Sequence, residues 1–155
     1  MPPTVRAALL DEIQDVGDSL GYNPKWCNDE ITWFLTLLDN PNHLFDRSMA
    51  QDVRLFMGQN LHVRAVLWDW VLVCKLQRLQ SIHPAKKEDL FDCAEITKIL
   101  YFNRGGRLIG RDILQAFDDT DRAPPIFRST AEIVGNYSRD QWGVFPFDLE
   151  GLPED

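Results

Sequence analysis

The chain has 155 residues, which is enough for one domain that buries a sizeable core. With 45% hydrophobic and 26% charged residues it has the composition of a globular protein and not of a disordered one. A net charge of -8 argues against a general nucleic-acid binder, which would present a basic surface. We therefore expect a single domain, residues 1–155, that does not bind nucleic acid.

Neither end of the sequence has the pattern of a targeting or membrane segment. The first twenty residues carry acids where a signal peptide would be apolar. No stretch approaches the roughly 18 to 20 apolar residues that span a bilayer, and "FPFDLEGLPED" does not resemble an anchor. The three cysteines, Cys27, Cys74 and Cys93, lie far apart and form no CxxC pair, which is typical of reduced thiols. The sequence therefore predicts a cytoplasmic protein.

Apolar residues recur at helical spacing along the first sixty residues. "TVRAALLDEIQDVGDSLGY" predicts an amphipathic helix that Gly21 and Pro24 end. "NDEITWFLTLLDN" predicts a second helix, capped by Asn28 and stopped by Pro41. "LFDRSMAQDVRLFMGQN" predicts a third, whose inward face would carry Leu44, Met49, Val53, Phe56 and Met57.

The next predicted helix, residues 61–80, differs from its neighbours in having no polar face at its centre. Residues 65–74 are apolar nearly all round, with Asp69 the exception. A helix of this kind belongs in a protein interior or a membrane, and at this length the interior is favoured. We expect a central hydrophobic helix wrapped by amphipathic ones.

Helical patterns continue to the end of the chain. His83-Pro84 ends the central helix, and "EDLFDCAEITKILYF" predicts a helix with Leu90, Cys93, Ile96 and Leu100 facing inward. A Gly-Gly pair at 105–106 interrupts it, "LIGRDILQAFDD" predicts a short helix, and "STAEIVGNYSRDQWGVF" predicts a last one. Strand-like alternation is nearly absent, so we predict an all-α fold of seven or eight helices.

No local motif indicates a metal site or a catalytic centre. The three histidines, His43, His62 and His83, have no metal-ligand spacing with one another or with the cysteines. The acidic run at 118–121 lacks the glycine and the distal glutamate of a calcium loop. "NRGGRLIG" is not a dinucleotide fingerprint, and no nucleophile elbow occurs. We predict no cofactor, no metal and no enzymatic activity.

The stretch "LFMGQNLHVRAVLWDW", residues 55–70, resembles the Bcl-2 family of apoptosis regulators. In that family a helix ends in a Leu-Phe-like pair, a short Gly/Asn link follows, and Asn-Trp-Gly-Arg opens a central hydrophobic hairpin helix. Arg64 falls on the family's arginine without a gap. Leu61, His62 and Val63 stand where the family has Asn-Trp-Gly, which is a departure from the motif.

A second region of resemblance lies about forty residues further on. "YFNRGGRLIGRDILQAF" is similar to the family's second homology region, with Asn103, Gly105 and Gly106 matching. Arg107 replaces the tryptophan that the family has after its Gly-Gly pair. The departures and the absence of an anchor pattern look more like a viral homologue than a cellular one.

The start of the chain is similar to the family's first helix. "LLDEIQDVGDSLGYNPKW" carries Gly21-Tyr22 and a later Trp26. The same segment has Ile13 and Gly17-Asp18 at the spacing of the ligand helix that the family recognises. We interpret it as the first helix, because little chain precedes it. The resemblance then spans roughly residues 5 to 117.

The resemblance implies a Bcl-2-like helical bundle that sequesters the Bcl-2 homology-3 helix of pro-apoptotic proteins in a hydrophobic groove, and so opposes apoptosis. Arg64 would bind the ligand's aspartate, because a guanidinium matches a carboxylate with two hydrogen bonds. Partners at mitochondria could recruit the protein there. The groove would be lined by Phe45, Met49, Val53, Phe56, Leu61, Val66 and Leu67.

Two other interpretations of the sequence stay open. An acidic all-α inhibitor or immunity-type protein could block a basic partner by charge, in which case binding would fall steeply with salt. A homodimer could use an exposed apolar face as its own interface. Taken alone, an apolar helix face is more often core than groove, and an arginine beside it is more often a snorkelling surface residue.

Overall fold

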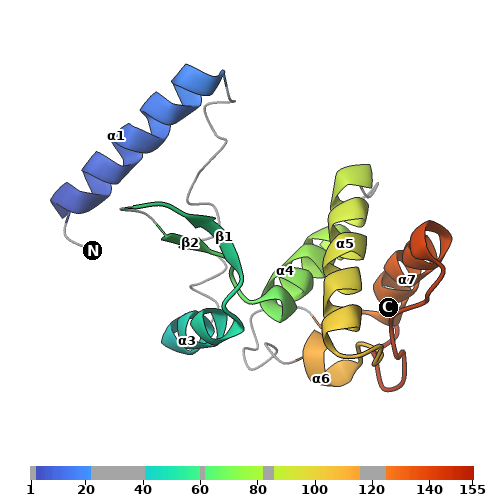
Figure 1. The fold of residues 1–155 in the computed structure, drawn as a ribbon. Helices are drawn as coiled ribbons and strands as arrows, with labels where there is room; N and C mark the ends of the chain where they lie inside the picture. Colours follow the sequence, from blue (N-terminus) through green and yellow to red (C-terminus); the bar gives the residue numbers. More distant parts are fainter. Residues whose placement is uncertain (1–2, 22–40, 60–61, 82–85, 116–124) are drawn as a thin grey trace. The chain divides into compact units, whose positions relative to one another are not determined.

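The computed structural model describes residues 3–21, 41–59, 62–81, 86–115 and 125–155 (Figure 1). The chain divides into two compact units, Met1–Leu35 and Thr36–Asp155, which are described separately. The single domain over residues 1–155 stays a prediction. The predicted second helix and Leu61 of the predicted groove lie outside the described residues.

The first unit contributes helix α1, Pro3–Leu20, as its sequence pattern predicts. The helix ends where Gly21 adopts a left-handed φ of 68° and donates its N–H to the carbonyl of Asp18, at 3.3 Å. Glycine reaches this conformation without the steric cost of a Cβ, which is why it so often follows a helix. Leu10 and Leu20 of this helix are exposed.

The second unit begins with helix α3, Pro41–Gln51, and a hairpin of strands β1, Arg54–Met57, and β2, His62–Arg64 (Figure 1). The prediction of one helix through residue 60 and another from residue 61 was therefore wrong. The chain leaves α3 through Asp52, whose φ is 52°, a left-handed conformation that Asp tolerates better than most residues. The β-branched Val53 and the aromatic Phe56 that follow favour a strand.

The register of the hairpin determines which side chains share a face. Arg54 pairs with Arg64 and Phe56 pairs with Val63, so one extra residue, Leu55, lies between them in β1. Residues opposite one another in an antiparallel pair point to the same side of the sheet. The bulge therefore places Arg54 and Arg64 on one face and puts Phe56 with Val63 on the other.

Helix α4, Trp68–Ser81, is the interior helix that the sequence predicts, although it begins at Trp68 instead of residue 61. It packs against α5 (Lys87–Asn103), α6 (Arg111–Leu114) and α7 (Arg128–Trp142), and α5 also packs against α7 (Figure 1). The core cluster of this unit contains Leu72, Val73, Leu76, Leu79, Cys93, Ile96, Leu100, Ile109, Ile113, Leu114, Ile126, Ala131, Val134, Phe147 and Leu152.

Helices α5, α6 and α7 confirm the predictions for the second half of the chain. Gly105 and Gly106 follow α5 with φ of 66° and 84°, as the predicted interruption requires. The segment after α7 returns to the core, where Phe147 forms an isolated parallel bridge with Ile109. The described residues are thus mostly helical, with a two-stranded sheet that the all-α prediction omitted. Among them, no helix has both the length and the apolarity to cross a membrane.

Candidate ligand-binding surface

Large apolar side chains are exposed on α3 and on the hairpin. Of the twelve large hydrophobic residues that are exposed in the described part of the chain, six lie between residues 45 and 63. Single exposed apolar residues are ordinary, but a concentration of them marks an interaction site. We call this set the α3–hairpin surface; it consists of Phe45, Met49, Leu55, Phe56, Met57 and Val63.

The residues predicted to line a groove fall into two groups. Phe45, Met49 and Phe56 belong to the α3–hairpin surface, with Phe45 the most exposed at 63%. Val53 and Val66 are half-buried, and Leu67 is buried just before α4. The sequence interpretation missed Leu55, Met57 and Val63, because it assigned these positions to helices. The unbroken apolar run 55–57, which no single helix face accommodates, was the available signal.

An ion-pair cluster lies at the base of the hairpin. Arg54 donates to both oxygens of Asp52, from Nε to Oδ1 at 3.2 Å and from Nη2 to Oδ2 at 2.9 Å. Arg64 donates from Nη1 to Oδ1 of the same carboxylate. The hydrogen bond from Arg54, together with the positive charges of both arginines, holds the pKa of Asp52 below its usual range.

This cluster holds two guanidinium groups and one carboxylate. Asp52, Arg54 and Arg64 together carry one surplus positive charge, in a chain whose net charge is -8. Arg64 is the less exposed arginine, with 26% of its side chain accessible against 53% for Arg54. A guanidinium in this setting can bind the carboxylate of a ligand, because it offers five donors in a fixed plane.

The end of α3 holds the start of α4 in place. Gln51 donates from Nε2 to the carbonyl of Val66 at 3.3 Å, and its Oε1 accepts the N–H of Trp68 at 2.9 Å. The hydroxyl of Ser48 accepts the N–H of Leu67 at 3.0 Å. These side chains satisfy N–H groups that have no partner inside α4, as a capping residue would. These hydrogen bonds thereby connect α3, which carries part of the α3–hairpin surface, to the interior helix α4.

We expect Gln51→Ala to lower the free energy of unfolding by about 1 to 2 kcal/mol, in the range of a lost helix cap. Both hydrogen bonds that Gln51 makes across the junction between α3 and α4 would disappear. Urea unfolding monitored by tryptophan fluorescence measures the change. Gln141→Ala, at an exposed position of α7, is the control. Equal losses in the two variants would contradict the capping role of Gln51.

Burial raises the pKa of three side chains in the described part of the second unit. Burial raises the pKa of the Cys74 and Cys93 thiols to about 12, so both are protonated and unreactive near neutral pH. Burial also raises the pKa of Asp69, against the opposing charges of Arg47 and Arg104. Within the described residues, no three His, Cys, Asp or Glu side chains are grouped so as to hold a metal ion.

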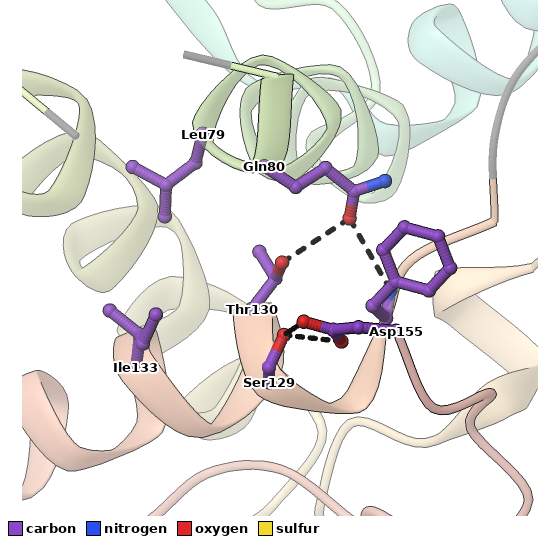
Figure 2. A pocket seen from close by; sticks show the side chains of 7 residues that line it. Leu79, Gln80, Ser129, Thr130, Ile133 and Asp155 are labelled. Carbon is purple, nitrogen blue, oxygen red and sulfur yellow. Dashed lines mark hydrogen bonds between the residues drawn. The ribbon is translucent and has the colours of Figure 1, made fainter. Parts of the chain in front are cut away.

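A hollow of about 370 Å³ lies between the end of α4 and the start of α7 (Figure 2). Its polar groups already bind one another: Ser129 donates to the carboxylate of Asp155, and Thr130 donates to Oε1 of Gln80 at 3.3 Å. Gln80 also donates to the carbonyl of Pro125 at 2.8 Å. With its polar side chains satisfied in this way, the hollow does not indicate a particular ligand.

Comparison with known proteins does not assign the chain to a family. No family model, no curated protein and no solved structure matches it significantly. The residues and geometry of the α3–hairpin surface therefore carry the functional interpretation.

Proposed function

We propose that the protein binds an amphipathic helix of a partner protein on the α3–hairpin surface. More specifically, we propose an anti-apoptotic role, in which a cytoplasmic, non-enzymatic protein sequesters the Bcl-2 homology-3 helix of pro-apoptotic proteins. The observation that supports the proposal is the concentration of exposed apolar side chains on α3 and the hairpin. The resemblance of residues 55–70 to the Bcl-2 family supports the identity of the ligand.

Burial of apolar side chains would drive this binding. A ligand helix places apolar residues on one face, where they can cover Phe45, Met49 and Phe56. Each fully buried anchor contributes about 1.5 to 3 kcal/mol. Ordering of the ligand helix and its lost rigid-body freedom offset much of this gain. Several anchors are therefore needed, which favours a broad surface over a single pocket.

Arg64 would supply the specificity for an acidic ligand. It lies at the end of β2, on the hairpin face opposite Phe56, so a ligand helix that contacts both would lie along the edge of β2. Arg64 and Arg54 share the negative charge of Asp52. The surplus positive charge of the cluster would attract the ligand's aspartate. A hydrogen bond to a charged group contributes about 1.5 to 3 kcal/mol, so Arg64 would be a main determinant of affinity.

We expect Arg64→Ala to weaken binding of a homology-3 helix peptide by roughly tenfold to one hundredfold, in line with a lost charged hydrogen bond. Isothermal titration calorimetry of parent and variant measures the change. Arg107→Ala, which removes an exposed arginine elsewhere in the second unit, is the matched control. Binding by Arg64→Ala that equals binding by the parent would exclude the assigned role.

A homodimer through the same surface is a second candidate. The described part of the chain contains a sheet of two strands, so each strand has an edge without a further strand. Such edges can pair with another chain, and a hairpin of two strands is only marginally stable alone. Light scattering with and without peptide distinguishes the two candidates, because a dimer that uses this surface would dissociate when peptide binds.

A further inference from the structure

Asp52 is placed by an unusual backbone conformation. It is the one residue other than glycine with a positive φ in the described part of the chain. Its N–H donates to the carbonyl of Met49 at 3.2 Å, which closes the last turn of α3. Asp and Asn are among the few residues that tolerate this region, because their short side chains bond locally. The turn directs the Asp52 carboxylate to Arg54 and Arg64.

The two arginines bind this carboxylate unequally. Arg54 contacts both oxygens, through Nε and Nη2, whereas Arg64 contacts Oδ1 alone, through Nη1. If Arg64 left, Asp52 would keep a two-point ion pair with Arg54 and would stay neutralised. Arg64 can therefore be released from the cluster without leaving an unpaired acid behind.

We propose that Asp52 is an internal competitor for Arg64, a contact that holds the arginine in the free protein and that a ligand's carboxylate must replace. The proposal rests on the function proposed above and adds a residue that lowers the affinity for acidic ligands. A ligand without an acid at this position cannot replace Asp52. Its affinity should therefore stay the same when Asp52 loses its charge. The Asp52 charge thus opposes acidic ligands alone.

Asp52→Asn tests the proposal with little disturbance of the fold. Asparagine has the same shape, adopts the left-handed conformation readily, and keeps one oxygen that can accept from Arg54. Exposed ion pairs contribute at most about 1 kcal/mol each, so the variant should remain folded, which its thermal unfolding would verify. The charge that repels an incoming carboxylate would be gone.

The experiment is a calorimetric titration with a homology-3 helix peptide and with the same peptide carrying alanine in place of its aspartate. We expect Asp52→Asn to bind the intact peptide on the order of fivefold more tightly than the parent, the scale of one exposed ion pair. Binding of the alanine peptide should not change. Asp46→Asn, an exposed change of the same net charge on α3, is the matched control and should change neither affinity.

Several outcomes would overturn the proposal. Unchanged or weaker binding of the intact peptide by Asp52→Asn would show that Asp52 does not compete. An equal gain for Asp46→Asn would assign the effect to net charge alone. In each of these cases the parent still binds peptide, so the proposed function survives. If neither parent nor variant binds any peptide, the proposed function and the competitor role both fail.

Discussion

Gly135→Ala is expected to lower the free energy of unfolding by about 1 to 3 kcal/mol, the cost of overpacking a core. In an exposed helix interior the same change stabilises a protein by up to about 1 kcal/mol. The sign reverses here because a Cβ on Gly135, in the middle of α7, would lie 2.4 Å from Cε2 of Phe145 and 2.6 Å from its Cζ. Real side chains do not approach so closely, so the ring would have to move.

Urea unfolding of the single and double variants measures this effect. Phe145→Leu removes the ring, so Gly135→Ala should cost less in that background than in the parent. The coupling between the two changes is the diagnostic quantity. A Gly135→Ala variant as stable as the parent, or more stable, would contradict the close approach of Phe145 to α7.

Phe56→Ser is expected to weaken ligand binding by roughly tenfold or more, since a buried aromatic anchor is worth about 1.5 to 3 kcal/mol. The variant's stability should change little, because Phe56 is 55% exposed in the free protein. Phe91→Ser is the matched control: Phe91 lies on α5, outside the α3–hairpin surface, and is 52% exposed. Calorimetry with one peptide and parallel urea unfolding give both quantities.

The Phe56 and Phe91 variants distinguish binding at the α3–hairpin surface from nonspecific apolar binding. Equal losses of affinity in both would place the binding energy outside the α3–hairpin surface. A large loss of stability in Phe56→Ser would instead show that Phe56 supports the fold. Either result would remove Phe56 from the proposed site.

The helices of this protein were predictable where one face is clearly apolar and a breaker follows. Helix α1 ends at Leu20, before Gly21, and α5 ends at Asn103, before the Gly105-Gly106 pair. Helix α4 was recognisable as interior because residues 65–74 are apolar nearly all round, and Leu72 and Leu76 are fully buried. Local composition and steric rules decide these features, so the sequence alone suffices.

The hairpin was not predictable in the same way. Val53 and Phe56 continue the helical spacing of the apolar residues in α3, and nothing local marks Asp52 as the point where the helix ends. In its left-handed conformation, Asp52 pairs its carboxylate with Arg64, twelve residues further on. Such a contact depends on the pairing of two strands, which helical periodicity does not report.

The candidate site, too, was predictable from the sequence only in part. Phe45, Met49 and Phe56 were named from the sequence because they are large, apolar and regularly spaced, and they are exposed. The pairing of Arg54 with Arg64 follows from the bulge at Leu55, which sequence spacing alone does not reveal. The apolar residues of the surface could therefore be predicted from the sequence, whereas the pairing of its charged residues could not.

Calorimetric titration of the unmodified chain is the most direct test of helix binding at the α3–hairpin surface. The titrants are homology-3 helix peptides with the ligand aspartate intact or replaced by alanine. We expect at least one intact peptide to bind with a dissociation constant below about 1 μM, and its alanine version to bind at least about tenfold more weakly. Absence of binding across the panel, or equal binding of each pair, would contradict capture of an acidic amphipathic helix.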